Sequence, residues 1–196
     1  GELDGFISEN ACCDDLNNFT DYKYPVQGVY YSLYFNLRNE KLSDVELRRK
    51  LQRVIPIEDL IFDKGIYVQG PISRSFFTNK ALVFDNYDEK LKDDLENLEI
   101  FVTVPDEKIH TSLVNDIAKI WEDKLNVNVE IKKENPETFV SEIIEKRNFE
   151  ILLYGQEVGR DPDRYVIWHS AQKEPPNLNI SGFDQMRAAF GDANSG

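Results

Sequence analysis

The chain has 196 residues, of which 41% are hydrophobic and 12% aromatic, and this apolar content supports a packed core and excludes a disordered chain. No apolar run approaches the roughly 18 residues that a membrane-spanning helix needs. The 23 basic and 36 acidic residues give a formal net charge of −13, whose field repels phosphate backbones, so we expect no nucleic-acid partner.

Residues 1–27 are acidic and rich in turn-forming residues, which predicts an N-terminal loop segment. Residues 29–37 are rich in β-branched and aromatic side chains, and they predict a strand that is covered on both faces. Tyr30, Tyr31 and Tyr34 of this strand either line a cleft or pack within the sheet, and the sequence leaves both interpretations open.

Short helices are predicted after this strand. Ser43 and Glu46 match the capping-box pattern, which predicts a helix that begins at Ser43 and that Pro56 either ends or kinks. Residues 57–62 and 88–98 predict two further short helices.

The pattern is clearest after residue 98, where strands and helices alternate. A strand is predicted at 99–104, and Pro105 begins a helix whose apolar residues recur at four-residue spacing. The row comprises Ile109, Leu113, Ile117, Trp121 and Leu125, and we expect Trp121 to lie in the core.

A strand at 127–131 follows, and Asn135 and Pro136 then match the N-cap and first position of another helix. The predicted buried face of that helix comprises Phe139, Val140, Ile143 and Ile144. Residues 149–154 predict a third strand, apolar enough to be central. Because right-handed crossovers join parallel strands, we predict an α/β fold, a mixed sheet with a parallel β-α-β-α-β unit and flanking helices.

A candidate ligand site follows from this topology. Open α/β sheets bind ligands at the carboxyl ends of their strands, and the loop at 155–163 leaves the sheet there. Glu157 and Asp161 either pair with a ligand ammonium group or, in the case of Asp161, cap a turn. Arg160 either reaches a ligand carboxylate or stays solvated, and Trp168 is either core or cleft wall.

The sequence offers no pattern for covalent or metal chemistry. His110 and His169 have no partner at metal-ligand spacing, and the adjacent Cys12 and Cys13 match neither a zinc motif nor a disulfide framework. We therefore expect a protein that is not an enzyme and that uses no cofactor and no metal.

Five short motifs along the chain carry the strongest signal for a protein family. They are Tyr34-Phe35-Asn36 with Leu42–Leu51, Gly70-Pro71-Ile72, Tyr87–Leu91, Gly155–Asp163 with Trp168, and Asn179–Phe183. Together they resemble bacterial solute-binding proteins of family 5, the oligopeptide- and dipeptide-binding proteins of ABC importers. We expect Asn36 of the first motif to hold neighbouring backbone.

The resemblance falls on the second half of the family's sequence. It implies a periplasmic-binding-protein-like (type II) lobe over residues 28–190, as one half of a two-lobed clamp that closes on its ligand. It further implies a peptide or similar small polar solute as ligand, an ABC permease as partner of the whole protein, an extracytoplasmic location and a monomer. The composition of residues 191–196 predicts a flexible tail.

The ligand loop departs from the family pattern. Gln156 stands where peptide binders often have Trp, so Glu157 or Asp161 is left to supply the carboxylate that pairs with a peptide amino terminus. The predicted ligand contacts are Tyr31, Tyr154, Gln156, Glu157, Arg160, Asp161 and Trp168. Two other functional classes stay open, a sensory or interaction domain on the same scaffold and, less favoured, an α/β enzyme.

Overall fold

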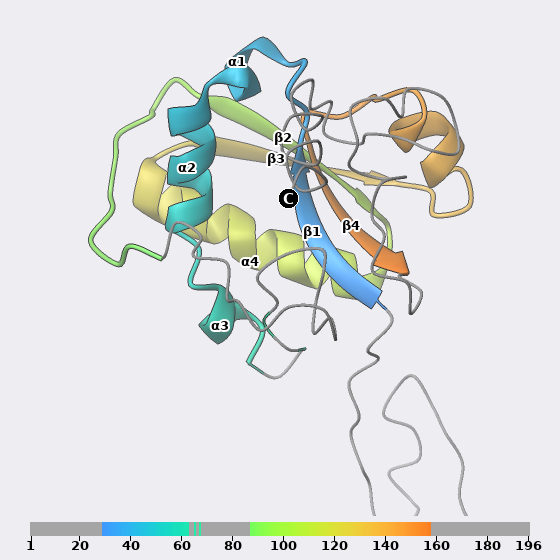
Figure 1. Ribbon diagram of the computed structural model, residues 1–196, viewed down its shortest axis with the longest axis horizontal. Coiled ribbons are helices and arrows are strands. Elements are labelled where there is room, and N and C mark those ends of the chain that lie inside the picture. The colour runs from blue at the N-terminus through green and yellow to red at the C-terminus, as the bar shows by residue number, and fades with distance from the viewer. Residues whose placement is uncertain (1–28, 63–64, 66, 68–86, 158–196) are drawn as a thin grey trace, which may run out of the picture.

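The computed structural model describes residues 29–62, 65, 67 and 87–157 (Figure 1). Its elements are β1 (Val29–Phe35), α1 (Glu40–Ser43), α2 (Val45–Arg53), α3 (Ile57–Leu60), β2 (Glu99–Pro105), α4 (Lys108–Leu125), β3 (Asn128–Glu134), the π-helix η1 (Val140–Ile144) and β4 (Ile151–Glu157). None of the helices in these ranges combines the length and the apolar character that crossing a bilayer requires. The predictions for 1–27, 158–190 and 191–196 lie outside the described residues.

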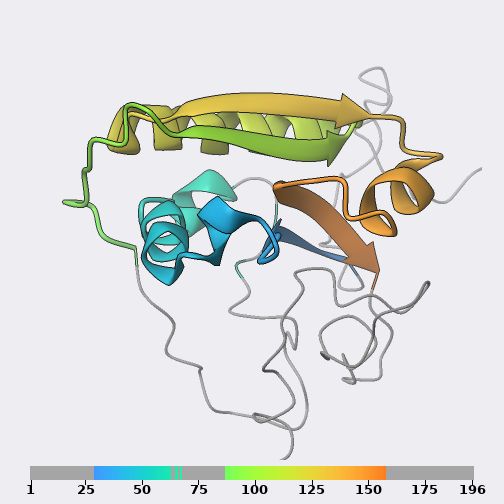
Figure 2. The same cartoon turned by 90° about the horizontal axis from the view of Figure 1, so that it is seen from above.

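The four strands form one mixed sheet in the order β1-β4-β2-β3. β2 pairs in parallel with both β3 and β4, and β1 pairs antiparallel with β4. Figure 2 shows β2 and β3 side by side along α4. The predicted α/β fold, its three parallel strands and the central place of β4 are therefore confirmed.

The side chains of the sheet alternate between two faces, and each face has its own core. On the α4 face, Val102 and Ile151 pair across strands and pack with α4 and α2. On the η1 face, Leu152 and Tyr34 pack with η1 and with Phe149. Because the sheet is covered on both sides along β4, this strand carries the fully buried run that its sequence predicted.

The prediction that β1 is covered on both faces is wrong for its first half. Tyr30 is buried on the η1 face, but Tyr31 on the α4 face is 37% exposed. Val29 is exposed as well, since α4 begins only at Lys108 and leaves this end of the strand uncovered.

α4 begins three residues later than predicted, because Pro105 is still the last residue of β2 and pairs with Glu134 of β3. The helix packs the predicted row against the sheet, except that Ile109 is 40% exposed and His110 is buried in its place. His110 is on the side of the first turn that meets Tyr31 of β1.

Trp121 joins the two main helices, which confirms its predicted core position. Its ring is fully buried, and its indole Nε1 donates a 2.8 Å hydrogen bond to the carbonyl of Leu51 in α2. A buried indole needs such a partner, and the bond fixes how α2 lies on α4.

The predicted capping box at Ser43 is not formed. Asp44 is the N-cap of α2 and accepts a 2.8 Å bond from the Glu46 amide, while the Ser43 hydroxyl donates back to the Glu40 carbonyl. Asn39 caps a separate turn, α1, which ends at Ser43 and leaves Asp44 in the extended conformation that an N-cap needs. The predicted end of this helix near Pro56 and the short helix after it, α3, are confirmed.

The helix predicted at 88–98 is wrong. In this segment the amides of Asp93 and Leu95 donate to the carbonyls of Lys124 and Leu125, the last residues of α4. These carbonyls have no partner within α4, so the segment satisfies them and forms isolated turns, such as the one closed by the Leu91 amide and the Asp88 carbonyl, instead of a helix.

The helix predicted after Asn135 starts as a turn and continues as the π-helix η1. Asn135 Oδ1 accepts from the Glu137 amide, as an N-cap does, and Phe139, Ile143 and Ile144 are buried as predicted. Val140 was predicted to be buried but is 45% exposed, because the wider π turn rotates it away from the sheet.

Asn36 has the backbone-holding role that the sequence predicted. Its Nδ2 donates a 2.9 Å bond to the Phe149 carbonyl, and its Oδ1 accepts from the Arg38 amide. The buried Asn36 amide therefore ties the end of β1 to the residues that lead into β4.

Asn126 ends α4 in the left-handed conformation, with φ of 52°. We expect Asn126→Ala to lower the free energy of unfolding by about 1–2 kcal/mol, because Ala bears the left-handed strain and loses the 2.8 Å bond to Asp94. Urea unfolding followed by circular dichroism measures the change. Asn126→Gly loses the same bond without the strain, so it should cost less, and equal losses for the two variants would contradict this account.

Candidate functional site

The carboxyl ends of the parallel strands meet at one edge of the sheet, which we call the carboxyl edge. It comprises the ends of β2, β3 and β4 at Pro105, Glu134 and Glu157, together with the start of β1 at Val29, which pairs with Glu157. Open α/β sheets bind ligands at this edge because the connecting loops diverge there and leave polar backbone groups unpaired.

The structure brings four of the predicted ligand contacts together at the carboxyl edge. Tyr31 pairs with Gly155, between Tyr154 and Gln156, and the backbone of Glu157 ends the strand. The other three predicted contacts, Arg160, Asp161 and Trp168, lie outside the described residues.

On the α4 face, the edge carries an aromatic contact with a charged neighbour. The rings of Tyr31 and His110 meet edge to face with centroids 5.2 Å apart. Nδ1 of His110 lies 2.9 Å from Oε2 of Glu107, close enough for an ion pair when the ring is protonated. Neither ring nitrogen makes a well-aligned hydrogen bond to any residue that the structure describes.

Two opposing effects act on the proton of His110. Burial of the ring lowers its pKa below the ordinary 6.5, and the Glu107 carboxylate partly offsets this by favouring the charged form. The same carboxylate, added to burial, raises the pKa values of Tyr31 and Tyr154. At neutral pH the edge therefore holds neutral rings beside the exposed Glu107 carboxylate.

On the η1 face, two tyrosines converge on Gln156. The hydroxyl of Tyr30 donates to Oε1 of Gln156 over 2.5 Å, and the hydroxyl of Tyr34 donates to the same oxygen over 2.6 Å. Both tyrosines are buried, and burial raises the pKa of Tyr34 far above its ordinary value. Of the two interpretations left open for Tyr30 and Tyr34, packing is confirmed, with hydroxyl groups that also reach the edge.

Tyr154 lines the η1 face beside these residues. Its ring stacks on Phe139 with centroids 5.6 Å apart and an interplanar angle of 14°. Phe139 is fully buried, and the Tyr154 ring that stacks on it is half-buried. An aromatic wall of this kind suits ligands with variable side chains.

Sequence reasoning missed Glu107 and His110 as members of the edge. Asp106 and Glu107 directly follow a predicted parallel strand, so the rule that selected the loop after β4 also selects them. His110 carried no such signal, since its burial depends on Tyr31, which is far away in the sequence. Within the described part of the chain, no group of three or more His, Cys, Asp or Glu side chains is placed to hold a metal ion.

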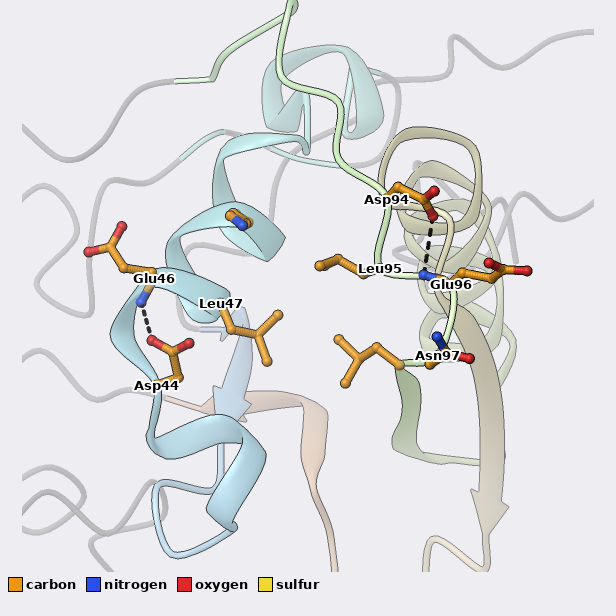
Figure 3. A pocket seen from close by; sticks show the side chains of 9 residues that line it. Asp44, Glu46, Leu47, Asp94, Leu95, Glu96 and Asn97 are labelled. Atoms are coloured by element: carbon orange, nitrogen blue, oxygen red, sulfur yellow. Dashed lines mark hydrogen bonds between the residues drawn. The ribbon is translucent and has the colours of Figure 1, made fainter.

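A groove of about 550 Å³ lies at the opposite end of the sheet, between α2 and the segment before β2 (Figure 3). Leu47 and Leu95 point toward each other across it, with Asp44 and Glu96 at its rim. It contains none of the predicted contacts, and the geometry of parallel sheets favours the carboxyl edge as the ligand site.

Comparison with known proteins identifies the fold. No family model matches the chain, and no curated protein sequence matches it. Among solved structures, the chain is similar to NikZ from Campylobacter jejuni in complex with Ni(L-His), with a TM-score of 0.70 and 18% identity over 86% of this chain. It is also similar to the oligopeptide-binding protein AppA from Bacillus subtilis in complex with a nonapeptide, with a TM-score of 0.67 and 17% identity over 85% of this chain.

The chain spans only 39% of the length of each of these two proteins. A third structure, the peptide-binding protein of a peptide ABC transporter, is matched over 85% of this chain and 86% of its own, with a TM-score of 0.63 and 15% identity. The predicted periplasmic-binding-protein-like fold is therefore confirmed, and the match covers only a part of NikZ and of AppA.

The depressed pKa of His110 makes stability depend on pH. The native state favours the neutral ring, so unfolding takes up a proton when the pH falls below about 6.5, and the free energy of unfolding should fall there. Urea unfolding between pH 8 and pH 5 measures this loss. His110→Gln should reduce the loss, and a variant with the wild-type pH dependence would contradict the assignment.

Glu107→Gln provides the matched test of the ion pair. Without the carboxylate only burial acts on the ring, so the pKa of His110 should fall further. An NMR titration of the imidazole resonances measures the value, and a higher pKa in the variant would exclude an attractive contact.

The ring of Tyr31 lies over Gly155 and leaves no room for a side chain there. A Cβ added at Gly155 would lie 2.7 Å from Cε1 of Tyr31, so Gly155→Ala should push the ring away from His110. The partly exposed ring can turn outward, so we expect a stability loss of about 1 kcal/mol and the loss of nuclear Overhauser effects between Tyr31 and His110. Gly65→Ala is the control, since nothing lies within 4 Å of its added Cβ, and an unchanged Tyr31–His110 contact in Gly155→Ala would refute the expectation.

Proposed function

We propose that this chain is one ligand-binding lobe of an extracytoplasmic solute-binding protein that serves an ABC importer, with a peptide or a similar small polar solute as ligand. The observation that carries the proposal is the carboxyl edge, where aromatic rings, a carboxylate and an oriented amide gather on a sheet of the solute-binding fold.

The chemistry of the carboxyl edge fits recognition of a peptide. A peptide offers an ammonium group, neutral carbonyls and variable side chains. Glu107 supplies an exposed negative charge, Gln156 supplies an amide, and Tyr31 and Tyr154 supply aromatic surface. None of these contacts requires a covalent step, so we propose that the protein is not an enzyme.

A single lobe supplies only part of a binding site. Hinge closure against a second lobe would exclude water and strengthen the charged contacts, since the local dielectric falls. The predicted contacts Glu157, Arg160, Asp161 and Trp168 belong to the same proposal, as further contributions from the loop after β4. An ABC permease as partner, action as a monomer and the absence of nucleic-acid binding complete it.

The proposal is tested on the whole protein that contains this chain. Thermal unfolding is measured with defined peptides of two to nine residues and with Ni(L-His), and small-angle scattering is recorded with and without each ligand. A ligand at 100 times its Kd should stabilise the native state by about 2.7 kcal/mol and make the protein more compact.

Glu107→Gln is the matched variant, because it removes the edge charge and keeps the shape of the side chain. It should weaken binding of a peptide with a free amino terminus more than binding of its N-acetylated form. Absence of any stabilisation by all these ligands would refute the proposal, and stabilisation by Ni(L-His) alone would replace a peptide with a metal chelate as the ligand.

A further inference from the structure

The side-chain amide of Gln156 is oriented by its two tyrosine partners. A carbonyl oxygen has two lone pairs, and the hydroxyls of Tyr30 and Tyr34 occupy both on Oε1. The two tyrosines come from one face of β1, and Tyr34 is fully buried, so their hydroxyl positions are fixed by the core. The amide of Gln156 is therefore held with its oxygen inward.

The nitrogen end of this amide has no partner among the residues that the structure describes. Nε2 carries two N–H donors, and neither makes a hydrogen bond to any residue in the described ranges. Gln156 is half-buried, one residue before the end of β4, at the carboxyl edge. An unpaired, partly desolvated donor gains more from a ligand acceptor than a donor that is already bonded.

The charges at the edge select the kind of acceptor. Asp106 and Glu107 follow β2 at the same edge, Lys133 Nζ lies 3.9 Å from Oδ1 of Asp106, and the whole chain carries a net charge of −13. A ligand carboxylate would be repelled by Glu107 and by the net negative charge, whereas a neutral carbonyl oxygen accepts a hydrogen bond without this penalty.

We propose that Gln156 donates a hydrogen bond from Nε2 to a neutral carbonyl oxygen of the ligand, of the kind that a peptide backbone offers, and that Tyr30 and Tyr34 are positioning residues that fix its direction. This inference rests on the proposed function, since it assigns a role to one residue within that binding edge. It places a donor where the resembling peptide binders often have a Trp.

The test uses the ¹⁵N-labelled chain and the uncharged probe N-acetylalanine N′-methylamide, with weak binding followed by NMR. The side-chain amide signals of Gln156 should shift saturably as the probe is added. Gln156→Glu keeps an acceptor for both tyrosines but offers no donor, so it should raise the Kd of the probe roughly tenfold. Gln52→Glu, the same change at an exposed position of α2, should leave the Kd unchanged.

The positioning role has a separate readout. Tyr30→Phe with Tyr34→Phe removes both anchors, so the heteronuclear NOE of the Gln156 side-chain nitrogen should fall as the amide becomes mobile. The single change Tyr34→Phe serves if the double variant does not fold. An unchanged NOE would show that the hydroxyls only stabilise the core, and would overturn their positioning role.

The outcomes separate this inference from the proposed function. If the probe shifts the backbone amides of Gly155 and Glu107 but not the side chain of Gln156, the edge binds ligand and the role of Gln156 is wrong. If acetate binds more tightly than the uncharged probe, the preference for a neutral carbonyl is wrong. If no edge residue shifts with either probe, both the inference and the proposed binding edge fail.

Discussion

The parallel pairing of β2 with both of its neighbours is the constraint on which the rest of the structure depends. Because parallel strands run in the same direction, each connection between them has to return along the sheet. The helices α4 and η1 lie in these connections and cover the two faces, and all three parallel strands end at the same edge. The bond from Trp121 to the Leu51 carbonyl then fixes α2 against α4 on one side. The carboxyl edge follows from this strand order, because the residues at the ends of the parallel strands all lie at the same end of the sheet.

The carboxyl edge combines buried neutral groups with exposed charge. Burial keeps the Tyr34 phenol protonated and favours the neutral form of His110, while Glu107 remains in contact with solvent. Such a surface can orient hydrogen bonds without a large cost of burying charge. Such chemistry suits the reversible binding that we propose for this edge.

The strands and long helix were predictable because their signals are local. Alternation in β3 and the four-residue apolar spacing of α4 come from contacts that each element makes along its whole length. The helix predicted at 88–98 failed because its amides serve the end of α4, a partner that no local pattern reveals.

The site was predictable only in part, for the same reason. The topology rule found Gln156, because it follows the strand predicted at 149–154. The structure places that strand, β4, at Ile151–Glu157, so Gln156 belongs to the strand and not to the predicted loop. The sequence did not reveal that Tyr30 and Tyr34 hold this amide or that His110 is buried under Tyr31, since those contacts join β1 to residues about 80 to 125 positions away.

The antiparallel pairing of β1 with β4 has a mechanical consequence. Val29 lies opposite Glu157, so the chain enters the described sheet and leaves it through two adjacent strand ends. Tyr31 and Gln156 lie within the paired ladder of these two strands, one on each strand. A force applied at either strand end would therefore be shared by the strand that carries the other side chain.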